Sequence, residues 1–263
     1  MTFHPVEEVS GRADGIAGMV LICDHASNAV PPEIGTLGLT DADMQRHIAW
    51  DIGARAVTLG LSARLGAPAL MSTWSRLVID PNRGTDDPTL VMRLYDGSII
   101  PGNRHIDAAE IARRTEAYHR PYHGAIDAAL DRIEASGEQP YIVSIHSFTP
   151  QLKGKAPRPW HIGLLWDGDD RMMAPLFEEL ERDTDLCIGN NEPYNGALTG
   201  DCMWQHGTQR GIAHVLIEIR NDLITTPEGQ ERYADLLAPI LTRAIAQARA
   251  APISSDQEVR THV

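Results

Sequence analysis

Three almost uninterrupted apolar runs divide the chain: residues 19–23 (MVLIC), 141–145 (YIVSI) and 214–219 (HVLIEI). Apolar side chains on both faces are typical of central strands in a parallel sheet that helices cover on both sides. Shorter apolar stretches predict further strands. The strands that we expect cover residues 18–24, 67–72, 77–79, 141–145, 161–166, 186–188 and 212–219.

Between these strands, apolar residues recur every three to four positions, as in helices with one buried face. Thr40 is a suitable N-cap for the first of these helices, and Pro121 is expected to kink or split the second. Alternating strands and helices predict one three-layer α/β/α domain over residues 1–263, with a mixed, largely parallel sheet and irregular tails at about 1–15 and 252–263. The expected helices cover residues 41–65, 107–135, 171–182, 201–209 and 227–250.

Composition narrows the class of protein. Hydrophobic residues make up 43% and charged residues 22% of the chain, as in soluble globular proteins, and no stretch is apolar enough to span a membrane. The net charge of −13 argues against nucleic acid or an anionic membrane as a partner. The first residues do not resemble a signal peptide, and three widely spaced cysteines suggest reduced thiols, so we expect a cytoplasmic protein. The sequence does not indicate an oligomeric state.

Polar side chains stand where four of the apolar runs stop. MVLIC is followed by Asp24 and His25, YIVSI by His146, the run at 77–79 by residues 80–83 (DPNR), and HVLI by Glu218. In open α/β sheets the ligand-binding crevice lies at the carboxyl ends of the strands. The four endings together therefore predict a functional site there.

Two histidines and a carboxylate form a typical catalytic zinc site, with water in the remaining position. His25 and His146 are the candidate metal ligands, and Asp51 is the preferred third because it interrupts an apolar helical stripe. Asp24 is the alternative ligand, or else an outer partner that orients a histidine. Zn²⁺ is the expected metal, although another divalent ion could replace it. The histidines could instead be core residues bonded to the backbone, and Asp51 could face solvent.

Glu218 is the candidate general base and acid, because a carboxylate near a metal can take a proton from water and return it to a leaving amine. It could instead occupy a surface position on an edge strand. Arg76, Asn82 and Arg83 form a candidate pocket for a substrate carboxylate, since arginine binds carboxylates in a planar, two-pronged geometry. Either arginine could equally pair with surface acids.

Two ring-rich segments, residues 118–123 (YHRPYH) and 204–211 (WQHGTQRG), could line the pocket through His123 and His206. Residues 190–196 (NNEPYNG) have the composition of a loop that closes over a site. Dinucleotide, P-loop and GxSxG motifs are absent from the sequence. Ser147 follows His146, but nothing in the pattern marks it as a nucleophile.

The order of HASN, WDIGA, SRLVIDPNR, RPYH, IHS, QHG and IEIRND between residues 19 and 223 resembles the N-formylglutamate amidohydrolase family. That family is similar to zinc carboxypeptidases and aspartoacylase-like deacylases, so the resemblance implies a zinc-exopeptidase-like (phosphorylase/hydrolase-like) fold. It implies metal binding by His25 and His146, with Asp51 at the place of a family aspartate. It further implies carboxylate binding by Asn82 and Arg83 with help from Arg76, and general acid–base catalysis by Glu218.

The implied reaction is metal-dependent cleavage of a small anionic N-acyl amino acid, N-formyl-L-glutamate first among the candidates, to formate and glutamate, as in histidine catabolism. Arg76 or His206 would stabilise the oxyanion. The chain has DHASN where family members of the histidine-degradation pathway have a Pro-His-Ala/Ser-Gly opening, so the substrate could be a different N-acyl amino acid. The chain could also be a serine or cysteine amidase that uses Ser147, Ser27 or Cys23, or a non-catalytic binder of acyl amino acids.

Overall fold

The three apolar runs lie side by side as parallel strands at the centre of one seven-stranded sheet, β2 (Met19–Cys23), β6 (Tyr141–Phe148) and β9 (Ala213–Arg220). The structure is a computed structural model that describes residues 3–250. The other strands of this sheet are β1 (Val6–Val9), β3 (Ala69–Ser72), β7 (Ile162–Leu165) and β8 (Ile188–Asn190). The order is β1-β3-β2-β6-β9-β7-β8, and only the β1–β3 and β7–β9 pairs are antiparallel.

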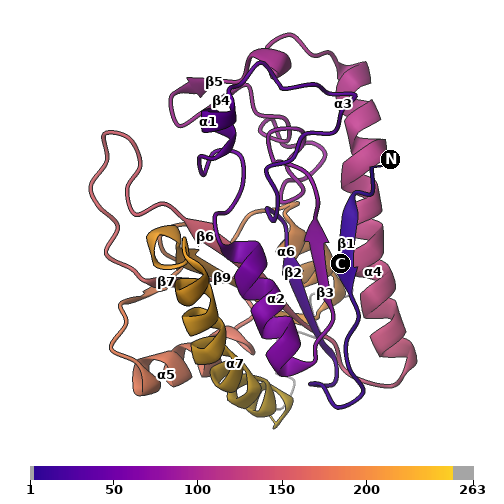
Figure 1. Cartoon of the computed structure of the whole chain (residues 1–263). Helices are drawn as coiled ribbons and strands as arrows, with labels where there is room; N and C mark the ends of the chain where they lie inside the picture. The colour runs from indigo at the N-terminus through magenta and orange to yellow at the C-terminus, as the bar shows by residue number, and fades with distance from the viewer. Residues whose placement is uncertain (1–2, 251–263) are drawn as a thin grey trace.

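Helices cover both faces of the sheet, as Figure 1 shows. One face packs against α2 (Ala54–Leu65), α5 (Met173–Asp183) and α7 (Pro227–Ala250). The other packs against α4 (Arg120–Ala135) and the short α6 (Cys202–His206). Alternate residues of β2 enter the two cores, which confirms the predicted three-layer architecture. Within residues 3–250, no helix combines the length and apolar character that crossing a membrane requires.

The helix predicted over 41–65 is interrupted in its middle, so this prediction was wrong in extent. Thr40 does cap a helix, but α1 (Asp41–Met44) ends after one turn and α2 begins only at Ala54. Gly53 has φ 84°, and a Cβ there would lie 2.2 Å from the carbonyl oxygen of Ile224. A helix cannot continue through this left-handed position. The break places Asp51 in a turn beside the sheet edge.

The predicted strand at 77–79 is a buried turn instead. Its carbonyl groups accept hydrogen bonds from side chains rather than from a neighbouring strand. Leu77 O accepts from Asn103 Nδ2 (2.7 Å), Val78 O from Arg114 Nη1 (2.8 Å) and Ile79 O from Trp74 Nε1 (2.8 Å). Apolar content alone does not distinguish such a run from a buried strand. The side chains therefore fix the backbone that leads into residues 80–83.

The helix predicted over 107–135 is continuous from Ala108 to Ala135, and its one irregularity is a π-helical turn just before Pro121. It consists of α3 (Ala108–Arg114), a π-helical turn at η2 (Thr115–His119) and α4, with Pro121 in the first turn of α4. The irregular tail predicted over 1–15 contains β1, and the tail predicted over 252–263 lies outside the described residues. The remaining elements are β4 (Leu94–Tyr95), β5 (Ser98–Ile99), η1 (Pro101–Asn103), η3 (Thr208–Arg210) and η4 (Asn221–Leu223).

Glu110 on α3 secures Arg114, which bonds the backbone of the 77–79 turn. Its hydrogen bonds to Arg113, then to Arg114, lower the pKa of Glu110 to about 2 although burial opposes the shift. A depressed carboxyl pKa adds stability above the unfolded value of 4.5, and this stability is lost as the pH falls through about 2. We expect Glu110→Gln to lower the free energy of unfolding by about 1 kcal/mol at pH 7. In urea unfolding, the difference in free energy of unfolding between wild type and Glu110→Gln should disappear as the pH falls from 5 to 2. A difference that does not change with pH would contradict this role.

Candidate active site

The strand ends bring three predicted residues together at the carboxyl edge of the sheet. His25 lies just beyond β2, and His146 lies near the end of β6. Glu218 on β9 is paired with His146 in the β6–β9 register. All three are buried, with at most 6% of their surface exposed. Glu218 is therefore on a central strand and not on an exposed edge.

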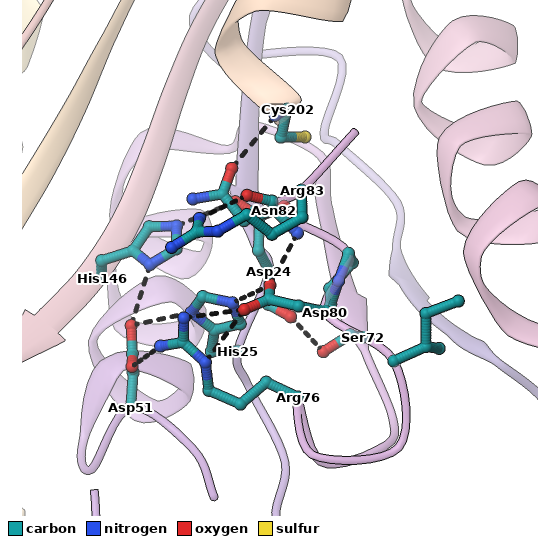
Figure 2. A network of polar contacts seen from close by, with 12 residues as sticks. Asp24, His25, Asp51, Ser72, Arg76, Asp80, Asn82, Arg83, His146 and Cys202 are labelled. Atoms are coloured by element: carbon teal, nitrogen blue, oxygen red, sulfur yellow. Dashed lines mark hydrogen bonds and ion pairs between the residues drawn. The ribbon is translucent and has the colours of Figure 1, made fainter. Parts of the chain in front are cut away.

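Asp51 joins this group through the break between α1 and α2. Its backbone N–H donates to His25 O at 2.9 Å, which fixes it next to the end of β2. Its Oδ2 lies 2.8 Å from His146 Nδ1 and 3.4 Å from His25 Nδ1 (Figure 2). The side chain is buried, so it does not face solvent. The turn therefore delivers the carboxylate that faces both imidazoles.

Each imidazole uses its other nitrogen to bond a second carboxylate. His25 Nε2 lies 2.7 Å from Asp80 Oδ1, and His146 Nε2 lies 2.8 Å from Asp24 Oδ2. A carboxylate on the far nitrogen of a histidine is the usual outer partner of a metal-ligating imidazole, because it sets the tautomer and orientation of the ring. In this geometry Asp24 has the outer position, and Nδ1 of each ring points toward Asp51.

These side chains fit a divalent metal. One ligand atom each from His25, Asp51 and His146 lies within 4.8 Å of the others. With Nε2–H donated outward, a neutral ring directs its Nδ1 lone pair at a carboxylate oxygen, an arrangement that either a proton or a metal ion satisfies. Burial opposes protonation, yet the hydrogen bonds that His146 makes to Asp24 and Asp51 still raise the pKa of His146 well above its usual value. The surrounding carboxylates therefore favour positive charge at this position.

Glu218 has the properties of a proton-transfer group. Its Oε2 is buried and has no hydrogen-bond partner among residues 3–250. Burial raises the pKa of Glu218 to about 7; the nearby His146 opposes this shift and Asp51 adds to it. A carboxyl whose pKa lies near neutrality can both accept and donate a proton at physiological pH.

The two predicted arginines, Arg76 and Arg83, differ in whether they form ion pairs with carboxylates of the protein. Arg76 is buried and pairs with Asp80 Oδ2 at 2.8 Å, with Asp51 Oδ1 3.7 Å away. Arg83 has no carboxylate within ion-pair distance among the described residues, and its guanidinium bonds Thr89 Oγ1 and Asn82 O. Asn82 Oδ1 accepts from the Cys202 N–H at 3.0 Å. Arg83 is thus the arginine free to bind an anion.

A cavity of about 130 Å³ lies among these groups. It is lined by His25, Asp51 and His146, by Glu218, and by Arg76, Asn82 and Arg83, whereas the alternative ligand Asp24 does not line it. The loop predicted to close over the site contributes Tyr194, Asn195 and Gly196. The candidate ligands, Glu218 and the two arginines therefore face one cavity.

His123 and His206 are not among the residues that line this cavity. Their rings bond each other, with His123 Nδ1 2.7 Å from His206 Nε2. His123 Nε2 bonds Pro81 O at 2.9 Å, so the pair lies behind the segment that carries Asn82. This placement gives neither ring the direct substrate contact that the sequence suggested.

Sequence reasoning missed several residues that line the cavity, among them His47, Asp201 and Met203. His47 Nδ1 lies 3.6 Å from Asp51 Oδ1, and burial lowers the pKa of His47 to about 4. Burial also raises the pKa of Asp201 to about 7. Met203 lies on α6. His47 precedes Asp51 by four residues, and this spacing could have indicated His47 from the sequence. Asp201 has only the pattern of an ordinary helix N-cap.

Comparisons with known proteins indicate the family of this chain. The family model of N-formylglutamate amidohydrolases matches residues 17–225. A gene product of Agrobacterium tumefaciens of known structure is 33% identical with a TM-score of 0.87, covering 93% of this chain and 96% of that chain. An N-formylglutamate amidohydrolase from Ralstonia eutropha JMP134 is 22% identical with a TM-score of 0.73, covering 94% and 99%. A comparison with curated proteins gave no match.

A metallo-carboxypeptidase from Burkholderia cenocepacia is more distant, with 14% identity and a TM-score of 0.41 over 93% of this chain and 61% of that chain. The segment matched by the family model runs from just before β2 to just after β9. It therefore contains both histidines, Asp51, the two arginines and Glu218. On this match the chain belongs to the N-formylglutamate amidohydrolase family.

Proposed function

We propose that the protein is a metal-dependent amidohydrolase that cleaves an N-acyl amino acid, with N-formyl-L-glutamate as the favoured substrate. One observation carries the proposal: a histidine–aspartate–histidine donor set, the carboxyl of Glu218 and the unpaired Arg83 face the same cavity. Zn²⁺ is the favoured ion because two imidazole nitrogens and one carboxylate are a usual catalytic zinc donor set.

His25, Asp51 and His146 would hold the ion, which when bound would polarise the amide carbonyl and lower the pKa of a water molecule. Glu218 would take a proton from this water as its oxygen attacks the acyl carbon. The carbon–nitrogen bond then breaks, and Glu218 returns the proton to the departing amine. For N-formyl-L-glutamate the products are formate and glutamate. Arg76 would donate to the carbonyl oxygen as its negative charge grows.

Nucleophilic catalysis by serine or cysteine has less support. Ser147 Oγ donates to Ile52 O at 3.0 Å, and Ser27 Oγ accepts from the Ala29 N–H at 3.1 Å, so neither is bonded to a histidine. Burial raises the pKa of the Cys23 thiol well above its usual value, which disfavours the reactive thiolate. An activated nucleophile needs a base within hydrogen-bond reach.

The test is an acyl-release assay with N-formyl, N-acetyl and N-succinyl derivatives of glutamate and other amino acids. Each is measured on the protein as purified, after treatment with a chelator, and after addition of Zn²⁺, Co²⁺ or Mn²⁺. We expect turnover of an N-acyl amino acid that the chelator abolishes and metal restores. Activity that survives complete metal removal would refute metal dependence. Thermal stabilisation by ligand with no turnover on any metal would indicate a binding protein.

Arg83→Ala should raise KM for the substrate by about 10- to 100-fold and change kcat less, because the lost contact is to a carboxylate that does not react. Arg132→Ala is the matched control, since Arg132 is exposed on α4 away from the cavity. Steady-state kinetics on N-formyl-L-glutamate measure both constants. A KM unchanged from that of the control would exclude Arg83 from substrate binding.

A further inference from the structure

A second group of metal-binding side chains lies outside the cavity. Cys202 and His206 are four residues apart on α6, so they share a face of that helix, and His123 on α4 lies opposite. All three are buried, and one donor atom from each lies within 4.8 Å of the other two. None of them is a ligand of the site described above.

The outward nitrogens of both histidines are already bonded to acceptors. His123 Nε2 lies 2.9 Å from Pro81 O, a carbonyl, and His206 Nδ1 lies 3.0 Å from the carboxylate of Asp127. Because a carbonyl and a carboxylate only accept, both of these nitrogens carry the ring hydrogen. A neutral imidazole has one N–H, so His123 Nδ1 and His206 Nε2 face each other at 2.7 Å with lone pairs. A shared proton or a metal ion between the two nitrogens would satisfy this contact.

We propose that His123, Cys202 and His206 form a second metal site, which binds Zn²⁺ or a divalent ion with the same preference for nitrogen and sulfur donors. Two imidazoles and a thiol are donors that Zn²⁺ prefers, and the thiol would lose its proton on binding. The carboxylate on His206 and the carbonyl on His123 are the outer partners expected for ligating histidines, as at the first site. Zinc–nitrogen bonds of about 2.0 Å put two tetrahedral ligand nitrogens about 3.3 Å apart, so the two rings must separate slightly.

The second site would hold the substrate-binding segment in place. His123 bonds Pro81 O, and the Cys202 N–H bonds Asn82 Oδ1, the contact drawn in Figure 2. A metal that ties α4 to α6 would therefore fix Asn82 and Arg83 from behind, without touching the substrate. Its three ligands are positioning residues. The inference goes beyond the proposed reaction; in its test only the total metal count, and not the thiolate band, rests on the first site.

Co²⁺ substitution tests the site directly, because the first site has no thiol among its donors. The protein would carry Cys187→Ser, which removes an exposed thiol. We expect about two metal equivalents per chain by elemental analysis, and a near-ultraviolet thiolate-to-Co²⁺ charge-transfer band. Cys202→Ser and, separately, His206→Gln should each leave about one equivalent and abolish the band. The double variant His25→Ala, His146→Ala should also leave about one equivalent but keep the band.

Circular dichroism and thermal unfolding of each variant establish that it is folded before its metal content is compared. A folded Cys202→Ser protein with wild-type metal content and an unchanged spectrum would overturn the proposal. So would the lack of any thiolate band in Co²⁺-loaded protein, which would mean that the two rings share a proton instead. If only the His25→Ala, His146→Ala double variant loses metal, the result would support the first metal site and refute the second.

Discussion

Glu218→Gln is expected to lower kcat by about 10²- to 10⁴-fold while metal content stays at the wild-type level. The amide has nearly the shape of the carboxyl but cannot accept and return a proton. Glu218 is buried, faces the cavity and has an oxygen with no hydrogen-bond partner among the described residues, so its substitution removes no structural contact from that atom. The loss should therefore appear in turnover and not in folding.

Kinetics on N-formyl-L-glutamate, elemental analysis and thermal unfolding measure these three properties. Glu138→Gln is the matched control, because Glu138 is exposed and lies beyond the end of α4. The base works only when deprotonated, so wild-type turnover should fall as the pH decreases. Burial raises the pKa of Glu218 to about 7 in the metal-free protein, and a bound cation lowers it, so the fall should lie on the acid side of pH 7. Near-normal turnover of metal-loaded Glu218→Gln would exclude the general-base role.

Much of this site could be predicted because its residues occupy positions where the strand pattern stops. His25, His146 and Glu218 each end or closely follow an apolar run, and the parallel sheet brings such ends together. Asp51 was found through a conflict, since a carboxylate in an apolar helical stripe needs a partner. The conflict pointed to a residue that lies beside both histidines, although the helix around it does not exist: Gly53 breaks it beside Ile224.

What the pattern could not predict depends on contacts between distant segments. The 77–79 run has the composition of a strand, but its carbonyls are taken by Trp74, Asn103 and Arg114, and the last two belong to elements far along the chain. None of the four residues of β1 is fully buried, and the strand pairs only at the sheet edge, so its periodicity is weak. The contact between the rings of His123 and His206 likewise depends on how α4 packs on α6. Such pairings are set by tertiary packing, on which a local pattern carries no information.

The metal affinities of Asp51→Asn and Asp24→Asn should show which aspartate is the metal ligand and which is the outer partner of a histidine. Asp51 Oδ2 faces Nδ1 of both histidines, whereas Asp24 Oδ2 bonds the far nitrogen of His146. Loss of an outer partner typically weakens metal binding by about 10- to 100-fold. We expect Asp24→Asn to show a loss of that size, and Asp51→Asn to weaken binding by more than about 100-fold, because a neutral amide replaces the only anionic ligand.

Metal affinity is measured by competition with a chelator, and thermal unfolding of the metal-free proteins serves as the folding control. The folding control matters most for Asp24, because its carboxylate also accepts from Tyr122 Oη at 3.0 Å and from Ser144 Oγ at 3.2 Å. Tyr122 bonds Oδ1 and Ser144 bonds Oδ2, so the amide oxygen of Asp24→Asn accepts from one hydroxyl while its NH₂ group donates to the oxygen of the other. Asp24→Asn should therefore fold, and its loss of metal affinity should come from the altered contact with His146. Should Asp24→Asn lose its metal entirely while Asp51→Asn retains it, the assignments would be reversed. The ligand would then be Asp24, and Asp51 would be the residue that orients the two rings.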